Sequence, residues 1–65
     1  MNIFITCNET QTGTRYWQVS WTIGTTTTGM EFRTPQAIAE HVAQFPDRNC
    51  VYRNGRNDKW TPVSI

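Results

Sequence analysis

The chain has no leucine and no long run of apolar residues, and these absences exclude some classes of protein. No segment approaches the ~20 consecutive apolar residues that a membrane-spanning helix needs. The first residues, MNIFITCNET, include neither a basic region nor a long apolar stretch, so they do not resemble a secretion signal. We therefore expect a cytoplasmic protein that does not bind membranes.

Cysteine and histidine are also scarce, with two copies of the first and one of the second. Cys7 and Cys50 are too few for a disulfide framework, and their spacing differs from that of structural zinc ligands. A nucleophilic pair of cysteine and His41 is compatible with the spacing, but neither cysteine lies in a known nucleophile motif. We expect two buried thiols, a half-buried His41 at the edge of the core, and no metal or cofactor.

Motifs of catalysis are missing as well. The four glycines are scattered along the chain and form no phosphate-binding loop. Asp47 and Asp58 would need a cleft to act as paired carboxylates, and 65 residues provide little volume for one. We expect both to be loop residues, and we expect a protein that is not an enzyme, with no catalytic residues.

Residues that favour β-strands are abundant. Threonine is the commonest residue with eleven copies, beside five isoleucines, four valines, three phenylalanines and three tryptophans. Apolar and polar residues alternate over 2–7, 15–23 and 28–33, and this period of two predicts three strands. Four consecutive threonines separate the last two strands. Gly24 and Gly29 flank the threonines, and we expect both glycines to supply the unusual backbone angles of a hairpin turn.

A helix is predicted over residues 34–45. Thr34 is a good N-cap, and Pro35 follows at the first helical position, where its missing N–H costs nothing. Pro46 ends the helix. The apolar residues recur at the spacing of one helix face: Ile38, His41, Val42 and Phe45.

The remaining residues predict a second hairpin. Cys50–Arg53 forms one short strand, Asn54-Gly55 is a strong turn signal, and the loop runs to Lys59. The last strand covers Trp60–Ile65, where Pro62 keeps it at an edge or introduces a bulge.

The resulting order is β-ββ-α-ββ in one domain over residues 1–65. This order predicts an α+β fold: a small antiparallel sheet of four to five strands with one helix packed on one face. We expect the strand at 15–23 to face the helix, since these two elements are the richest in apolar residues. If the helix covers the side of Trp17 and Trp21, the alternation places Tyr16 and Phe4 on the opposite, open face.

Aromatic and basic residues provide the strongest functional indication. The net charge is +1, but it is uneven: residues 1–45 carry two basic and three acidic side chains, and residues 46–65 carry four and two. Aromatic residues with arginine are typical both of protein-binding hot spots and of surfaces that bind single-stranded nucleic acid. We predict binding by the sheet face opposite the helix and by the last hairpin: Arg15, Tyr16, Tyr52, Arg53, Arg56, Lys59 and Trp60. The alternative, in which Tyr52 and Trp60 belong to the core, is equally consistent with the sequence.

The segment RYWQVSWTIGTTTTGMEFRTPQAIAEHVAQF resembles a known arrangement, a hairpin that runs directly into a capped helix. It is similar to the DNA-binding domain of plant ethylene-response factors and to the arm-binding domain of tyrosine recombinases. That resemblance implies a nucleic-acid-binding module. The strands of those domains carry many basic residues, whereas this hairpin has only Arg15 and Arg33.

In size and architecture the chain also resembles small inhibitors encoded by phages and mobile elements, which bind host complexes such as RNA polymerase or CRISPR surveillance complexes. This resemblance implies a non-enzymatic protein that covers a surface on a larger host protein or complex. We take that as the leading prediction and nucleic-acid binding by the basic and aromatic last hairpin as the alternative. An exposed sheet edge also allows a homodimer.

Overall fold

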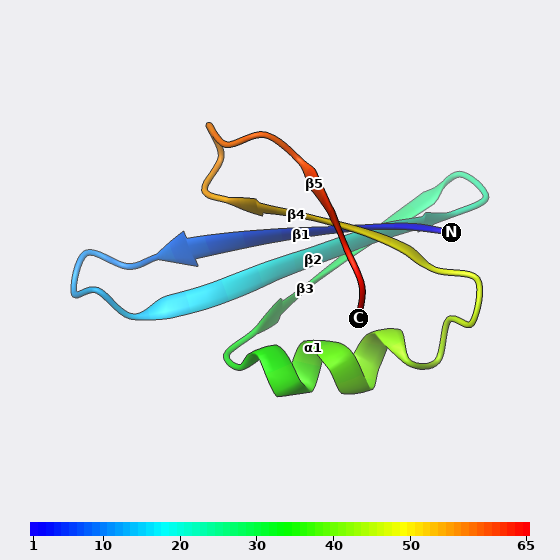
Figure 1. The fold of residues 1–65 in the computed structure, drawn as a ribbon, viewed down its shortest axis with the longest axis horizontal. Helices are drawn as coiled ribbons and strands as arrows, with labels where there is room; N and C mark the ends of the chain where they lie inside the picture. Colours follow the sequence, from blue (N-terminus) through cyan, green and yellow to red (C-terminus); the bar gives the residue numbers. More distant parts are fainter.

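A computed structural model describes residues 1–65, which form a five-stranded sheet and one helix (Figure 1). The elements are β1 (Asn2–Glu9), β2 (Arg15–Ile23), β3 (Thr26–Phe32), α1 (Pro35–Val42), β4 (Asn49–Asn54) and β5 (Thr61–Val63). The strand order across the sheet is β3-β2-β1-β4-β5. Figure 1 shows α1 running along one side of the sheet, with no helix on the other. The α+β class and the order of elements are as predicted.

The prediction of an antiparallel sheet is wrong for one pair of strands, because β1 and β4 run parallel. The other three pairs are antiparallel. The connection through α1 explains the difference. Strand β3 runs in the same direction as β1, and α1 returns the chain from the end of β3 to the end of the sheet at which β3 began. β4 therefore begins where β1 begins. The main-chain N–H of Asn49 donates to the carbonyl oxygen of Met1 at 2.6 Å at this common end.

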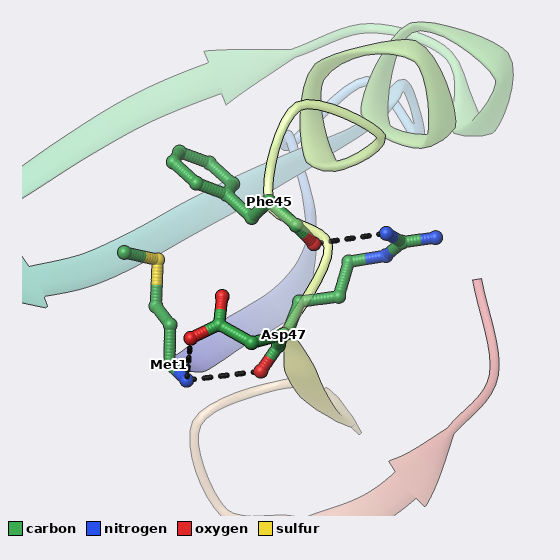
Figure 2. A network of polar contacts seen from close by, with 4 residues as sticks. Met1, Phe45 and Asp47 are labelled. Atoms are coloured by element: carbon green, nitrogen blue, oxygen red, sulfur yellow. Dashed lines mark hydrogen bonds and ion pairs between the residues drawn. The ribbon is translucent and has the colours of Figure 1, made fainter.

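The segment between α1 and β4 is fastened to the rest of the molecule by polar contacts (Figure 2). The amino group of Met1 donates to the carbonyl oxygen of Asp47 at 3.0 Å, and the Asp47 carboxylate lies 3.6 Å from the same nitrogen. The Arg48 side chain donates to the carbonyl oxygens of Phe45, at 2.9 Å, and Ile65, at 2.8 Å. These contacts position β4 beside β1 and hold the end of the chain near the helix.

The hairpin of β2 and β3 is tighter than the sequence predicted. Ile23 pairs with Thr26, so only two residues form the turn. Gly24 has a φ of 63°, which suits the first central position of a two-residue hairpin turn. The prediction for Gly29 is wrong: it lies inside β3, opposite Ser20, and its φ is not positive. The threonines extend the strand because β-branched side chains favour extended backbone.

The helix begins as predicted and ends earlier. The Thr34 hydroxyl accepts a hydrogen bond from the Ala37 N–H at 3.2 Å, which confirms the N-cap. After Val42 the bonding tightens, and the Phe45 N–H donates to the Val42 carbonyl at 3.0 Å instead of continuing the α pattern. Pro46 disfavours helical backbone at the preceding residue, which accounts for the short last turn. α1 is neither long nor apolar enough to cross a membrane.

The core lies between α1 and the sheet. Its buried residues come from α1 and from three strands: Ile3, Ile5, Val19, Trp21, Ile38, Val42 and Cys50. The Trp21 ring centroid lies 5.9 Å from that of Phe45. Strand β2 therefore faces the helix, as predicted.

His41 is half-buried at the edge of this core, as predicted. Its ring centroid lies 4.8 Å from that of Trp21 and 5.2 Å from that of Phe32. Its Nδ1 lies 3.2 Å from the Gln44 amide nitrogen, while its Nε2 is buried without a hydrogen-bond partner. The imidazole therefore packs as one ring of an aromatic cluster.

Cys7 and Cys50 are both buried and free. In the β1–β4 pair Cys50 is aligned with Ile3 and Cys7 with Asn54, so the two cysteines are four positions apart along parallel strands. This separation corresponds to about 13 Å at the rise of a β-strand, too far for a disulfide bond. The cysteines share the helix-facing side of the sheet and act as small apolar core residues.

Two titratable side chains on the helix-facing side of the sheet, Cys50 and Tyr52, lead us to predict that the protein loses stability at alkaline pH. Burial raises the pKa of the Cys50 thiol, and the positive charge of Arg48 opposes this rise. Burial is also the main cause of the raised pKa of Tyr52, and the neighbouring Cys7 raises it further. The folded state thus holds both protons more tightly than the unfolded chain, so this stabilisation is complete below the unfolded values and falls as pH rises above about 9. We expect the melting temperature, measured by circular dichroism, to decline from pH 9 to 11.

The matched variant for this experiment is Cys50→Ala combined with Tyr52→Phe. It removes both titrating groups and keeps the apolar side chains largely in place. Its melting temperature should fall less between pH 9 and 11 than that of the wild type. An equally steep decline in the variant would show that other groups cause the alkaline loss.

Candidate binding surface

The sheet face opposite α1, referred to below as the open face, carries a mixture of aromatic, charged and small side chains. Strand pairing determines which residues share it, because side chains alternate between faces along each strand. The open-face residues of the four longer strands include Phe4, Thr6, Tyr16, Gln18, Ser20, Gly29, Glu31, Val51 and Arg53. Arg33, directly after β3, lies on the same side, over the Tyr16 ring. On the part of this face formed by β2 and β3, the exposed residues are Gln18, Thr22, Thr27, Gly29 and Glu31.

Phe4, Thr6, Arg53 and Trp60 contact one another on the open face and form a group that we call the Trp60 cluster. The Arg53 guanidinium lies 4.2 Å above the centre of the Trp60 ring, and the Phe4 ring meets Trp60 edge-on at 5.2 Å between centroids. Arg53 Nε donates to the Thr6 hydroxyl at 3.0 Å. Phe4 is nevertheless 38% exposed and Trp60 40% exposed. Two large aromatic side chains are thus held in place without being buried.

The loop that carries Trp60 is held by its own hydrogen bonds. Gly55 has a φ of 91°, and its N–H donates to the Cys7 carbonyl at 2.9 Å, which ties the loop to β1. The Asp58 carboxylate accepts from the Asn54 N–H at 2.9 Å. Hydrogen bonds from the Asn54 and Lys59 backbone lower the pKa of Asp58, so this carboxylate is charged at neutral pH. The prediction of a loop that follows β4 and reaches Lys59 is confirmed, but the turn begins one residue later than predicted, because Asn54 is the last residue of β4 and Gly55 is the first loop residue. The predicted last strand, Trp60–Ile65, is too long: Trp60 belongs to the loop, and β5 covers only Thr61–Val63.

A shallow hollow of about 540 Å³ lies beside the Trp60 cluster. Its floor crosses β2 and β3 at Ser20 and Gly29, where the side chains are small or missing. Phe4 and Trp60 line one part and Glu31 another. The lining of the hollow thus combines two aromatic rings, an arginine and a carboxylate.

The structure separates the residues predicted to bind into two groups. Arg53 and Trp60 belong to the Trp60 cluster, and Arg56 and Lys59 are exposed in the adjoining loop. The Arg56 carbonyl oxygen accepts a hydrogen bond from Arg53 at 3.2 Å, which links the loop to the cluster. Tyr16 also lies on the open face, with the Arg33 guanidinium 5.8 Å from its ring centre.

Arg15 and Tyr52 lie on the other side of the sheet. The alternation of β2 places Arg15 with Trp17, and that of β4 places Tyr52 with Cys50. Tyr52 packs against the core and lines an apolar hollow of about 240 Å³ beside α1. The sequence left open whether Tyr52 and Trp60 were core or surface residues, and the structure assigns one to each side.

Sequence reasoning placed Phe4 on the open face but did not connect it with Trp60. It also omitted Thr6, Gln18 and Glu31, which line the hollow. The alternation of side chains in β1, β2 and β3 could have indicated all of these positions. The contact between Phe4 and Trp60 had no local signal, because it depends on how the β4–β5 loop folds over β1.

The charge near the open face is moderately positive. Arg33, Arg53, Arg56 and Lys59 contribute four positive charges against the two negative charges of Glu31 and Asp58, for a net +2. Two of these cations lie over aromatic rings: the Arg33 guanidinium lies over one face of Tyr16, and the Arg53 guanidinium over one face of Trp60.

No protein-family model, curated protein or solved structure matches this chain. A proposal of function therefore has to start from the residues of the open face. That surface combines ordered exposed aromatic rings, a hollow and a modest positive charge.

Proposed function

We propose that this chain is a non-enzymatic binding protein whose open face covers a surface of a larger protein. The observation that carries the proposal is the Trp60 cluster, in which an exposed tryptophan is held between Arg53 and Phe4. Tryptophan, tyrosine and arginine dominate the residues that provide most of the binding energy in protein interfaces. A monomer has little reason to leave a large ordered aromatic pair exposed unless a partner covers it.

Preorganisation supports the same proposal. Arg53 is held by Thr6, by the Arg56 carbonyl and by stacking on Trp60. Thr6 is itself buried at the base of the cluster. Ordering a flexible side chain on binding costs about 0.5–1.5 kcal/mol, and these side chains are already ordered. The cluster therefore offers contact area with little further loss of side-chain entropy.

The same contacts favour a protein partner over single-stranded nucleic acid. Nucleic-acid surfaces of this kind stack bases on free aromatic faces and bind phosphates with unpaired cations. Here a guanidinium already lies over one face of Tyr16 and of Trp60, and Arg53 uses its donors within the chain. A net charge of +2 near this face instead suits a partner with a mildly acidic rim around an apolar side chain.

The prediction that the chain inhibits or modulates a host protein complex, and is encoded by a phage or mobile element, forms part of this proposal. Its support is the small size, the single sheet with one helix, and the absence of a motif for catalysis. A protein of this size acts most simply by occupying a surface that another molecule needs.

A pull-down with the immobilised chain, from host lysate treated with nuclease, tests the proposal. We expect the wild type to retain a specific protein and the Trp60→Ala variant to lose it. Once that protein is purified, Trp60→Ala should weaken its affinity by at least about 30-fold, the effect of a hot spot worth about 2 kcal/mol. Calorimetric titration measures this change.

The matched control is Ile23→Ala, which removes a large side chain that is 59% exposed but lies at the tip of the β2–β3 hairpin, away from the Trp60 cluster. This variant should bind like the wild type. Retention of the partner by folded Trp60→Ala would contradict the proposal. Recovery of nucleic acid alone, with affinity falling by about 0.7–0.9 log units per phosphate contact for each tenfold rise in salt, would favour the nucleic-acid alternative instead.

A further inference from the structure

Strand β3 forms one edge of the sheet, and its outer side has no neighbouring strand. The two-residue turn makes Ile23 and Thr26 a hydrogen-bonded pair, and such pairs recur at every second residue of an antiparallel ladder. The backbone groups of the residues between them point away from β2. The outward-pointing residues are Thr27, Gly29 and Glu31, which leaves a regular row of free donors and acceptors along the edge.

The two edges of the sheet are protected to different degrees. β5 is only three residues long and contains Pro62, two features that prevent further strand pairing. β3 is seven residues long and contains no proline and no lysine. Met30, beside this edge on the helix side, is 45% exposed. An extended edge without such protection is a template for another strand.

We propose that two copies of this chain pair through their β3 strands, antiparallel, around a twofold axis at Gly29. In this register Gly29 lies opposite Gly29 of the second copy, and Thr27 lies opposite Glu31 of the second copy. All three outward-pointing residues then form hydrogen-bonded pairs, which joins the two sheets into one continuous sheet. On the helix side Thr28 faces Met30 of the second copy, which covers the exposed methionine.

We propose a second copy as the partner of this edge because two β3 edges fit each other when they run antiparallel around Gly29. A shift of register that centred the axis on Glu31 would set two carboxylates directly opposite each other, which is destabilising. The axis at Gly29 avoids this clash and places no side chains at the centre, so the backbones pair without obstruction. A twofold-symmetric dimer, in which both copies use the same surface, is the commonest closed assembly of identical chains.

The pairing is argued from the backbone of the β3 edge and does not depend on the function proposed for the open face. Gly29 and Glu31 also line the hollow beside the Trp60 cluster. The aromatic rings of that cluster belong to β1 and to the β4–β5 loop, and β2 lies between β1 and β3. In the proposed dimer each chain keeps its Trp60 cluster exposed, so the dimer displays two of them. The test uses the purified chain alone and needs no binding partner.

Analytical ultracentrifugation over a wide range of concentrations tests the pairing. We expect the wild type to approach twice the mass of one chain, and Gly29→Lys to stay at the mass of one chain because two lysines would then face each other. The fold should tolerate the change: Gly29 has no positive φ, and an added Cβ would meet only the Val19 carbonyl oxygen at 3.9 Å. Thr12→Lys adds the same charge in the exposed β1–β2 loop and should leave the dimer intact.

A second variant makes the test specific to the register. Gly29→Glu alone should also be monomeric, and an equimolar mixture of Gly29→Lys with Gly29→Glu should restore a dimer through the opposite charges. A wild type that stays monomeric at every concentration would overturn the proposal. So would a dimer that Gly29→Lys leaves intact, or a mixture of the two folded variants that remains monomeric.

Discussion

Trp21→Ala should leave the protein largely unfolded or close to unfolding at room temperature. Trp21 is only 7% exposed and contacts His41 and Phe45 across the interface between sheet and helix. Truncating a buried tryptophan to alanine costs about 3–5 kcal/mol. A chain of 65 residues has a total stability of about 3–10 kcal/mol, so this one change removes a large share of it. Guanidinium unfolding followed by circular dichroism measures the loss.

Trp60→Ala is the matched control for this experiment. It makes the same change on the open face, where the side chain is 40% exposed and contacts mainly Arg53 and Phe4. Losing these two contacts should cost about 1 kcal/mol. Equal losses for the two variants would contradict the division into a core face and a binding face on which the proposed function depends.

Val42→Asp should detach the helix from the sheet and unfold the chain. Val42 is completely buried between α1 and the strands. A carboxylate at this position would be buried without a partner, which costs several kcal/mol in addition to the lost packing. Loss of the near-ultraviolet circular dichroism signal and a sharply lower melting temperature are the expected results.

The control lies on the same helix, at Ala39, which is exposed. Ala39→Asp introduces the same charge within one turn of Val42, and its cost is limited to the weaker helix propensity of aspartate, about 0.7 kcal/mol or less. A Val42→Asp variant that melts like Ala39→Asp would show that α1 is not packed on the sheet.

Local sequence patterns predicted the individual elements well. The N-cap at Thr34, the period of the α1 face, the alternation in β2 and the loop after β4 were all recognisable, because each depends on residues within a few positions of one another. The errors also have local causes. Gly29 was assigned to a turn because glycine near a run of threonines resembles a loop, whereas Gly24 alone provides the backbone angle that the turn requires.

The candidate site was only partly predictable. Alternation placed Phe4 and Tyr16 on the face away from the helix, and the composition of the last hairpin singled out Arg53 and Trp60. Alternation was not applied to Tyr52, which the same rule would have placed with the core on the side of Cys50. The edge-on contact of Phe4 with Trp60 followed from no local pattern, since it joins β1 to a loop far along the sequence.

The sequence by itself determined which residues of this protein form strands and helix and which side of each is apolar, because backbone propensity and side-chain period act over short distances. The tertiary structure alone decided that β4 runs parallel beside β1, that β3 is left as the open edge, and that Trp60 lies over Phe4. These outcomes depend on the path of the chain through α1 and on pairing between distant strands. Their free energy comes from the whole assembled sheet, and no short segment encodes it.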